Sequence, residues 1–362
     1  MAPAPKPAST TRKQPKHAKA APRPRRVAIL GDGQMGLALA GVLTDGAGDV
    51  GITLWGHSHA EAAQLADSRI SPRLPDFRLA DRVLVTGDDA EALDGADLVV
   101  SAIPTQFSRA VWERLGGLVP AHAGVVSVTK GIEVGTLRFP VETIADALDE
   151  DPGAPTRPYA ALSGPTIAGE LAARRPATMV AASADEAFAR AVQDLFTADY
   201  LRVYTTTDLV GVELAGAAKN VIAIAAGALD GLKAGFNAKS ALLARGLAEI
   251  ARLGSALGAQ QDTFFGVAGV GDLATTCFCP SGRNRSCGEA LAQGVALDDY
   301  LQSTTSIVEG VQTAKSLREL CARHTVDMPI ADAVHSVLFD RLDPREAISR
   351  LMLRPAKEER VG

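Results

Sequence analysis

Cysteine is scarce in this 362-residue sequence, which holds Cys277, Cys279, Cys287 and Cys321 and no others. Four cysteines are too few to build a disulfide-stapled scaffold from a chain of this length. Three of them lie close together, but their Cys-x-Cys spacing differs from the common pattern of zinc ligands. The sequence therefore predicts reduced thiols, an intracellular protein and no metal site.

Long apolar runs are missing as well. The longest uncharged apolar run, from residue 221 to residue 229, is far shorter than the roughly 20 residues that a helix needs to cross a bilayer. With 47% hydrophobic and 22% charged residues, the composition is that of a soluble globular protein with room for two domains. We expect no integral membrane segment and a cytoplasmic location.

Acidic residues are absent from the first 26 positions, which hold eight basic residues and six prolines. Such a segment buries too little apolar surface to offset the entropy of ordering, so residues 1–25 are predicted to form a disordered basic tail. Because the whole chain carries −5 and these 26 residues carry +8, the remainder carries −13. That charge gives no reason to expect a nucleic-acid partner.

A glycine-rich turn follows the first apolar segment. Residues 27–30 are predicted to form a strand, and Gly31, Gly33 and Gly36 follow in a G-x-G-x-x-G pattern that opens a helix of small residues. In this context bare backbone N–H groups and the helix dipole can hold a pyrophosphate. A tight strand-to-helix turn without a ligand is the alternative.

The next predicted strand, 51–55, ends without an acidic residue. Where an NAD-preferring fold places a carboxylate for the ribose hydroxyls, the chain has Gly56, His57 and Ser58. We infer that no carboxylate is there to repel a 2'-phosphate and that NADP is at least tolerated. His57 as a plain surface residue is the alternative.

Further apolar runs predict strands at 82–85, 98–103, 125–128, 159–162, 177–182 and 201–204. Runs that are apolar on both faces indicate a parallel sheet covered on both sides, with ligands at the carboxyl ends of its strands. Lys130 falls at such an end, although an exposed lysine in a turn is an equal alternative. A helix start is predicted at Asp88, where Asp88-Asp-Ala-Glu91 has the pattern of a capping box, and Pro165 is placed at the first position of a helix. Residues 26–207 are predicted to be a Rossmann-type domain.

Helical patterns take over from residue 208 to residue 355, and residues 356–362 are assigned to a short tail. Lys219 lies inside an alanine, glycine and aliphatic run, with Asn220 beside it. Lysine is seldom buried without a partner, and desolvation lowers its pKa toward the range of an acid or base. A core helix whose lysine reaches out to water is the alternative.

Two further polar segments lie in this half. Asp272 follows three glycines and could orient a lysine, bind a substrate hydroxyl or cap a helix. Gly282, Arg283 and Asn284 come next; a guanidinium beside an amide suits a phosphate monoester, and a solvated basic turn is the alternative.

These motifs occur together in one order, from the glycine loop to the Val308-Glu309-Gly310 segment. Between them lie Leu54-Trp55-Gly-His57, Thr129-Lys130-Gly131, Leu162-Ser-Gly-Pro-Thr166, Gly216-Ala-Ala-Lys219-Asn220, Arg245-Gly-Leu-Ala-Glu249, Gly269-Val-Gly-Asp272 and Arg283-Asn284-Arg285. In these segments the chain, from about Arg26 to Glu359, resembles the bacterial NAD(P)-dependent glycerol-3-phosphate dehydrogenases.

The resemblance implies an α/β protein with an N-terminal Rossmann-type dinucleotide-binding domain and a C-terminal all-helical substrate domain. It implies reversible hydride transfer between NADP or NAD and the secondary carbon of sn-glycerol 3-phosphate, with dihydroxyacetone phosphate as the oxidised partner. The product would supply glycerophospholipid biosynthesis. A homodimer is the expected assembly on base rates alone.

The resemblance also implies residue roles. Lys219 would exchange the proton, with Lys130 and Asp272 as its catalytic neighbours. The substrate would lie against Lys130, Gly164, Thr166, Lys219, Asp272, Gly282, Arg283 and Asn284. The cofactor would lie against Gly31, Gly33, Gln34, Met35, Gly36, Trp55, His57, Lys130, Ala168, Arg283, Ile307 and Glu309.

Several positions depart from the common pattern of that family. Gln34 and Gly282 replace serines, and the segment 70–82 lacks the usual asparagine before Leu74. These departures affect affinity and cofactor choice rather than the charged groups. Two rivals remain: a two-domain dehydrogenase of hydroxy acids, and a non-catalytic dinucleotide sensor, which would leave the lysines and Asp272 unexplained.

Overall fold

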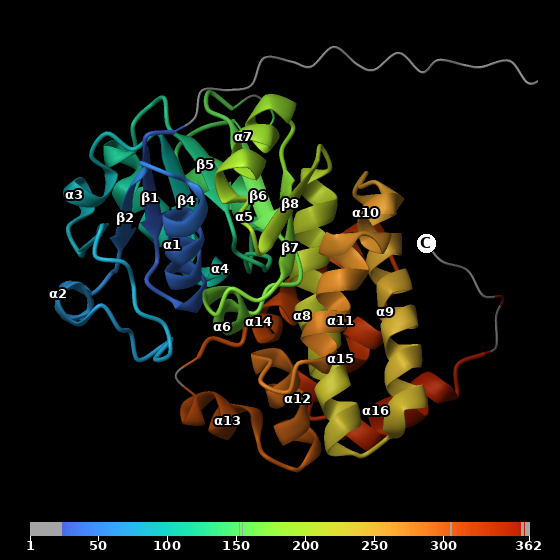
Figure 1. Ribbon diagram of the computed structural model, residues 1–362. Helices are drawn as coiled ribbons and strands as arrows, with labels where there is room; N and C mark the ends of the chain where they lie inside the picture. The colour runs from blue at the N-terminus through green and yellow to red at the C-terminus, as the bar shows by residue number, and fades with distance from the viewer. Residues whose placement is uncertain (1–23, 152, 154, 305, 356–357, 359–362) are drawn as a thin grey trace, which may run out of the picture.

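An eight-stranded sheet forms the N-terminal part of the computed structural model, which describes residues 24–151, 153, 155–304, 306–355 and 358 (Figure 1). The strands are β1 (Arg26–Leu30), β2 (Gly51–Trp55), β3 (Val83–Thr86), β4 (Leu98–Ser101), β5 (Gly124–Ser127), β6 (Tyr159–Ser163), β7 (Ala177–Ala182) and β8 (Leu201–Thr206). Nearly all of both predicted tails, 1–25 and 356–362, lies outside the described residues.

The strand order is β3-β2-β1-β4-β5-β6-β7-β8, which begins with the order of a Rossmann fold. All neighbours are parallel except β6 and β7, so the predicted all-parallel sheet is wrong at this pair. The reason is the short helix α6 (Ala168–Ala172) between them. Its five residues rise ~7.5 Å, about half the length of β6, and cannot carry the chain back for a parallel crossover.

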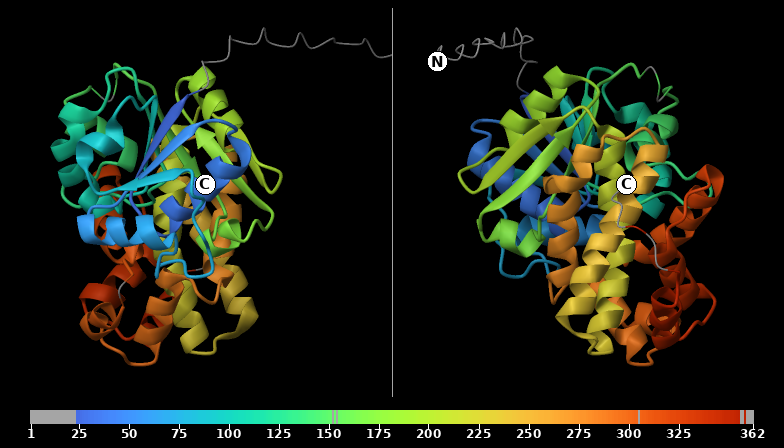
Figure 2. Two further views of the ribbon diagram at one scale, coloured as in Figure 1. Left: turned by 60° about the vertical axis from the view of Figure 1, so that its left-hand side comes forward. Right: turned by 90° about the vertical axis from the view of Figure 1, so that its right-hand side faces the viewer.

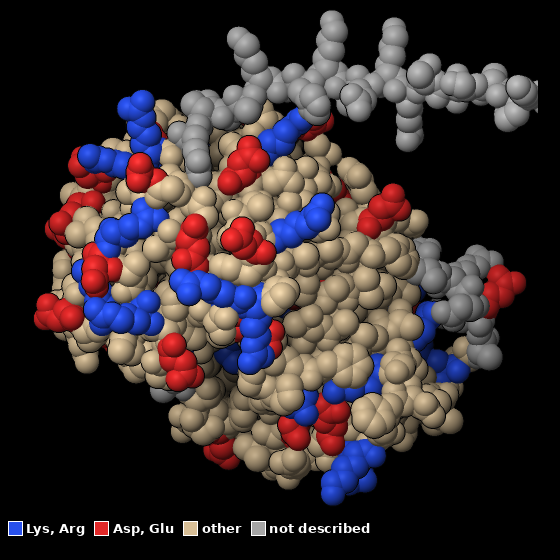
Figure 3. All heavy atoms as spheres, in the orientation of Figure 1, with Lys and Arg blue, Asp and Glu red and all other residues tan. Residues whose placement is uncertain are grey.

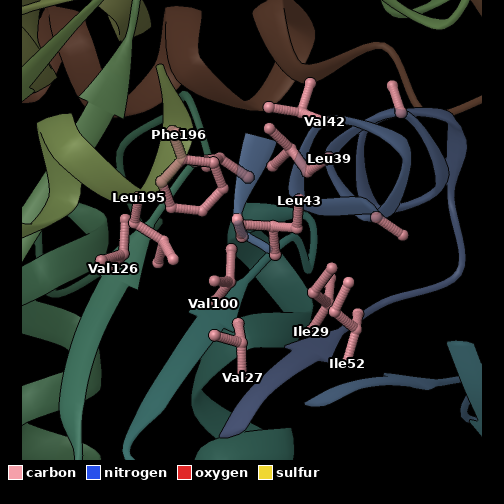
Figure 4. Packing of buried hydrophobic residues seen from close by; sticks show 14 of the residues in the cluster. Val27, Ile29, Leu39, Val42, Leu43, Ile52, Val100, Val126, Leu195 and Phe196 are labelled. Carbon is pink, nitrogen blue, oxygen red and sulfur yellow. The ribbon is translucent and has the colours of Figure 1, made fainter. Parts of the chain in front are cut away.

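Helices cover both faces of the sheet. They are α1 (Gln34–Gly46), α2 (His59–Ser68), α3 (Asp89–Leu93), α4 (Thr105–Leu115), the 3-10 turn η1 (Gly116–Leu118), α5 (Pro140–Ala147), α6 and α7 (Glu186–Phe196). Val27 and Ile29 of β1 pack with α1 and α7, while Ala28 and Leu30 pack with α4 and α5. Figure 4 shows the first of these layers. The alternation follows from the two-residue period of a strand.

The C-terminal part is helical, as expected (Figure 2). Its elements are α8 (Leu209–Gly231), α9 (Gly235–Ala256), α10 (Gln261–Phe265), the π-helical turn η2 (Val267–Gly271), α11 (Asp272–Phe278), α12 (Arg283–Ala292), α13 (Leu297–Ser303), α14 (Glu309–His324), α15 (Pro329–Phe339) and α16 (Pro344–Met352).

Helix α8 is the axis of this part and joins it to the sheet. Its Val212 belongs to the apolar cluster of α4 and α5, whereas Leu214, Val221 and Ile222 belong to the cluster of the helical part. By length and composition α8 could cross a membrane, but 83% of its apolar window is buried inside the protein. It is therefore placed as a core helix.

Two local predictions about helix starts had different outcomes. Asp88 caps α3, as predicted, and its carboxylate accepts a hydrogen bond from the Glu91 N–H at 2.8 Å. Pro165 was predicted at a first helical position and that is wrong, because α6 begins at Ala168 with Ile167 as its N-cap. Residues 164–167 instead run as an irregular segment toward the helical part.

Charges of both signs are intermixed on the face of the molecule shown in Figure 3. Among the described residues, many charged side chains are paired across elements, such as Arg174 with Asp45 at 2.8 Å and Arg354 with Asp327 at 2.7 Å. These pairs are solvent-exposed and each stabilises the fold by less than about 1 kcal/mol. The buried charged groups, described next, are the informative ones.

Candidate active site

Three glycines form the turn between β1 and α1. Gly31 has a φ of +117°, and a Cβ added to it would lie 2.8 Å from the Ala102 carbonyl oxygen. A Cβ on Gly36 would lie 1.9 Å from the Gly31 carbonyl oxygen, whereas a Cβ on Gly33 would meet nothing within 4 Å. Gly33 is the N-cap of α1 and offers no side-chain bond to its first N–H groups. This bare helix N-terminus fits the pyrophosphate of a dinucleotide.

Gln34 and Met35 offer their backbone rather than their side chains to this space. The Gln34 amide Nε2 donates to the Arg73 carbonyl oxygen at 2.8 Å. Met35 is half-buried and packs on the apolar cluster of α1. Any contact of these residues with a pyrophosphate would therefore come from their N–H groups at the start of α1.

The end of β2 differs from its prediction in one respect. The Trp55 ring is buried and donates to Asp89 at 3.0 Å, and His57 is exposed in the following turn. The inference that no carboxylate lies there is wrong. A Cβ on Gly56 would lie 3.0 Å from the Asp32 Oδ2, so the carboxylate of Asp32 reaches this strand end from the glycine loop.

A buried triad of charges lies where α8, α11 and the loop after β5 meet. Lys219 Nζ donates to Asp272 Oδ1 at 2.7 Å, and Lys130 Nζ donates to Asp272 Oδ2 at 2.6 Å. Asp272 is 2% exposed and Lys219 is 7% exposed. Two ammonium groups thus share one carboxylate, and the structure brings together the three residues predicted from distant parts of the sequence.

Burial changes the acid–base chemistry of Lys219. Desolvation lowers the pKa of Lys219 to about 8, opposed by the Asp272 carboxylate and assisted by the neighbouring charge of Lys130. Since its Nζ is bonded inside the protein, the alternative of a lysine reaching out to water is wrong. A lysine with this pKa can exchange a proton near neutral pH.

Small residues on α8 serve two purposes. A Cβ on Gly227 would lie 1.8 Å from the Arg285 carbonyl oxygen, so this glycine lets α12 approach α8. A Cβ on Gly216 would lie 3.4 Å from Lys130 Cγ and 3.2 Å from Ser163 Oγ, so this glycine makes room for the site. The small face is therefore mainly a helix-packing surface, with one turn facing the lysines.

The segment after β6 lies against the Lys130 ammonium and forms one side of the site. Lys130 Nζ and Thr166 Oγ1 both donate to the Gly164 carbonyl oxygen, at 2.9 and 3.2 Å. Gly164 has a φ of +146°, and a Cβ there would meet the Thr178 carbonyl oxygen at 2.7 Å. Only glycine therefore fits this turn, which fixes the Lys130 ammonium.

Asn220, the neighbour of Lys219, ties three segments together and is absent from the predicted site. Its Nδ2 donates to the Lys130 carbonyl oxygen at 3.3 Å, and its Oδ1 accepts from Asn284 Nδ2 at 2.9 Å. Asn284 Oδ1 accepts from the Gly310 N–H at 2.9 Å. The predicted phosphate ligand Asn284 is thus buried in a structural network, with its second N–H left to offer.

Glu309 crosses from the helical part to the sheet. Its carboxylate accepts from the Thr105 N–H at 3.1 Å, at the start of α4. Burial raises the pKa of Glu309, and the nearby charge of Arg283 opposes that rise. Arg283 is exposed at the start of α12, Gly282 caps that helix, and Ile307 is 40% exposed. Ala168 begins α6.

Thr276 is a contact of Lys219 that sequence reasoning missed. Its hydroxyl accepts from Lys219 Nζ at 2.5 Å and donates to the Asp272 carbonyl oxygen at 2.8 Å. Residues four apart share a helix face, so Thr276 lies one turn after Asp272 on α11. That spacing is the signal that could have found it.

Within the described ranges, no group of three or more His, Cys, Asp or Glu side chains is arranged to hold a metal ion. Cys277, Cys279, Cys287 and Cys321 are free thiols, and all but Cys279 are buried. Burial raises the pKa of Cys277 to about 12, which keeps it a neutral thiol. The three buried cysteines are thus packing residues.

A dinucleotide-type loop on a Rossmann sheet, together with two lysines that share one buried carboxylate where the sheet meets the helical part, defines the class of two-domain NAD(P)-dependent dehydrogenases. Comparison with known proteins narrows this class. Residues 26–189 match the family model described as the N-terminus of NAD-dependent glycerol-3-phosphate dehydrogenase, and residues 208–349 match that of its C-terminus. The chain belongs to the NAD-dependent glycerol-3-phosphate dehydrogenase family.

Relatives agree over nearly the whole chain. A glycerol-3-phosphate dehydrogenase [NAD(P)+] of Geobacillus kaustophilus is 44% identical over 335 residues, which cover 92% of this chain and 96% of that protein. One of Thermobifida fusca is 44% identical over 341 residues, covering 93% and 99%. The crystal structure of the Coxiella burnetii glycerol-3-phosphate dehydrogenase has a TM-score of 0.85 at 34% identity, covering 91% and 99%. The predicted family and fold class are confirmed.

Proposed function

We propose that this protein catalyses reversible hydride transfer between NAD(P)H and dihydroxyacetone phosphate, giving sn-glycerol 3-phosphate for glycerophospholipid biosynthesis. The observation that carries the proposal is the triad of Lys219, Lys130 and Asp272, in a chain whose first Rossmann turn also leaves a helix N-terminus bare for a dinucleotide. The names of the relatives supply the substrate, and the triad supplies a reason for its chemistry.

Lys219 exchanges the proton that must accompany hydride transfer. Reduction of a ketone leaves negative charge on its oxygen, and the Lys219 ammonium donates a proton there. In the oxidation direction, neutral Lys219 takes the hydroxyl proton. A pKa of about 8 lets the same group act in both directions near neutral pH.

Lys130 and Asp272 position the substrate and Lys219. Two ammonium groups and one carboxylate leave one excess positive charge in a nearly dry site, which attracts an anionic substrate. Asp272 holds both lysines, and the Lys130 ammonium is fixed by the Gly164 carbonyl oxygen. Gly164 and Thr166 form the wall beside them.

Arg283 holds the phosphate end of the substrate, helped by the second N–H of the Asn284 amide. A guanidinium can grip two phosphate oxygens at once. Gly282 precedes them as the N-cap of α12, so the first N–H groups of that helix are also available to an anion. In this proposal the phosphate lies at the start of α12.

The glycine loop fits a dinucleotide because Gly33 leaves the start of α1 bare. When bound, the nicotinamide supplies the hydride chemistry. We assign the cofactor to Gly31, Gly33, Gln34, Met35, Gly36, Trp55, His57, Lys130, Ala168, Arg283, Ile307 and Glu309. In this assignment Glu309 also accepts the Thr105 N–H at the start of α4, so it links the helical part to the N-terminal part.

The same proposal includes the domain division and the setting of the reaction. Residues 26–207 bind the cofactor and residues 208–355 hold the substrate, with basic and short tails at 1–25 and 356–362. The protein acts as a cytoplasmic homodimer on a small phosphorylated substrate, without a nucleic-acid partner or an integral membrane segment.

The test is to follow NADH and NADPH oxidation with dihydroxyacetone phosphate and, separately, with a branched 2-oxo acid. Turnover of the phosphate ester with sn-glycerol 3-phosphate as product is expected. Turnover of the 2-oxo acid alone would establish the rival hydroxy-acid dehydrogenase. Cofactor binding without turnover of either substrate would establish the dinucleotide sensor.

A further inference from the structure

Gln34, at the start of α1, and the segment 70–82 meet at one place. The Gln34 amide donates to the Arg73 carbonyl oxygen at 2.8 Å and ties that segment to the start of α1. The Arg73 guanidinium then bonds Glu61 at 2.7 Å and Asp32 at 3.4 Å. We call Asp32, Glu61 and Arg73 the ribose-end cluster.

The carboxylate of Asp32 lies where a Rossmann fold needs one for an unphosphorylated ribose. That group usually comes from the end of the second strand and binds the ribose hydroxyls. Here the strand end is Gly56, and a Cβ there would lie 3.0 Å from Asp32 Oδ2. The glycine loop therefore supplies the carboxylate, and Gly56 leaves the space for it.

Charge at the ribose-end cluster disfavours a further anion. Two carboxylates face one guanidinium, which leaves one excess negative charge. Asp32 is 7% exposed, so water screens its charge poorly. A ribose hydroxyl can donate to this carboxylate, whereas a 2'-phosphate carries negative charge and meets repulsion.

We propose that Asp32 accepts hydrogen bonds from the adenosine ribose hydroxyls of the cofactor, and that the protein thereby selects NAD(H) over NADP(H). Arg73 is the positioning residue that holds the Asp32 carboxylate at the end of β2. The inference rests on the proposed function only in placing a dinucleotide on the glycine loop.

The selection between NAD(H) and NADP(H) can be tested without hydride transfer, by measuring the binding of two cofactor fragments by calorimetry. ADP-ribose and 2'-phospho-ADP-ribose share every group except the 2'-phosphate. The wild-type protein is expected to bind ADP-ribose at least about tenfold more tightly, the size of one charge-assisted hydrogen bond. Equal binding, or tighter binding of the phosphorylated fragment, would overturn the proposal.

Variants separate a binding role of Asp32 from a structural one. Asp32→Ala should weaken ADP-ribose binding and strengthen 2'-phospho-ADP-ribose binding, because the buried carboxylate that repels the phosphate is gone and Arg73, which keeps Glu61 as a partner, can also approach the phosphate. The double variant Asp32→Ala/Arg73→Ala should lose that gain. Asp76→Ala, an exposed carboxylate on the same segment, is the matched control and should change neither affinity. An equal loss for both fragments in Asp32→Ala would show a structural role and overturn the proposal.

Failure of this inference is distinguishable from failure of the proposed function. A wild-type protein that reduces dihydroxyacetone phosphate but prefers NADPH keeps its function and loses the role of Asp32. A protein that prefers ADP-ribose but turns over no substrate keeps the role of Asp32 and loses the function.

Discussion

Two triads of charged groups in this protein have opposite composition. Lys219, Lys130 and Asp272 combine two cations with one carboxylate, whereas the ribose-end cluster of Asp32, Glu61 and Arg73 combines two carboxylates with one cation. The first is nearly dry, and the second opens to solvent at Glu61 and Arg73, which are 49% and 39% exposed. The excess positive charge of the first triad thus suits the phosphorylated substrate, and the excess negative charge of the second suits the adenosine ribose of the cofactor.

The difference teaches that the sign of the excess, rather than the presence of ion pairs, indicates what a site binds. Both triads contain hydrogen-bonded pairs of similar length. The excess positive charge of the Lys219 triad, in a low-dielectric site, attracts a phosphate ester. The excess negative charge of the ribose-end cluster suits hydroxyl groups, which donate hydrogen bonds to its carboxylates. Each prediction below changes one member of a triad.

Removal of Lys219 should have the largest effect. Lys219→Ala leaves no group to exchange the proton, so kcat should fall by about 100- to 10,000-fold with a smaller change in KM. Steady-state kinetics with dihydroxyacetone phosphate measures this. Lys233→Gln, at an exposed lysine just beyond the same helix, is the control. A variant of Lys219 with wild-type kcat would refute its role.

Neutralising Asp272 should have the next largest effect. The amide of Asp272→Asn accepts bonds but carries no charge, so two ammonium groups face each other uncompensated. We expect kcat to fall by about 100-fold. Because the Asp272 carboxylate raises the pKa of Lys219, loss of its charge should lower that pKa. The pH at which the reduction rate falls should then be lower than in the wild type, and a shift to higher pH would contradict this assignment.

Neutralising Glu61 should change cofactor selection only slightly. Glu61→Gln removes the excess negative charge of the ribose-end cluster, but the side chain is 49% exposed and its charge is screened. We expect 2'-phospho-ADP-ribose to bind about two- to fivefold more tightly, with ADP-ribose unchanged. Calorimetry measures both. A larger gain than in Asp32→Ala would show that Glu61 is the main source of repulsion.

Among the described residues, Glu213 is a buried carboxylate without a cation beside it, in contrast to the carboxylates of the two triads. Its effect is expected on the stability of the fold rather than on activity. Glu213 accepts the Val141 N–H at 2.9 Å, and desolvation raises its pKa to about 8 from 4.5. Its protonated form stabilises the fold below pH 4.5, and that contribution is lost as pH rises through 8.

Glu213→Gln keeps the bond to Val141 and cannot ionise. Its free energy of unfolding should exceed that of the wild type at pH 9 by on the order of 1 to 3 kcal/mol, with little difference at pH 4.5. Denaturant unfolding at both values measures this, with Glu91→Gln, at an exposed glutamate on α3, as the control. No gain at pH 9 would show that the Glu213 site admits water.

The parts of the fold that depend on local pattern were predictable. Apolar runs and the glycine turn predicted the sheet strands, because burial on both faces leaves a clear signal. The reversal at β7 was not predicted, because the apolar pattern of a strand does not show its direction, which here follows from the short length of α6. Pro165 was misplaced because its segment is shaped by Gly164 and the neighbouring strand rather than by helix capping.

The site divides in the same way. Lys219 stands out as a charge in an apolar run, and Asp272 as a carboxylate after glycines. Thr276 is indicated only by its position four residues after Asp272, and the contacts of Asn220 with Lys130 and Asn284 are made only after folding. Asp32 was not predicted because it lies more than 20 residues before the end of β2 in the sequence. Its carboxylate reaches that strand end from the glycine loop only in the folded protein.

The most direct test of the central claim is the pH dependence of both directions of the reaction. At saturating substrates, the reduction rate should fall as pH rises through about 8, because ammonium Lys219 donates the proton. The oxidation rate should rise through the same pH, because neutral Lys219 accepts it. Reduction and oxidation rates that both stay flat between pH 6 and pH 10, or change in the same direction, would contradict Lys219 as the group that exchanges the proton.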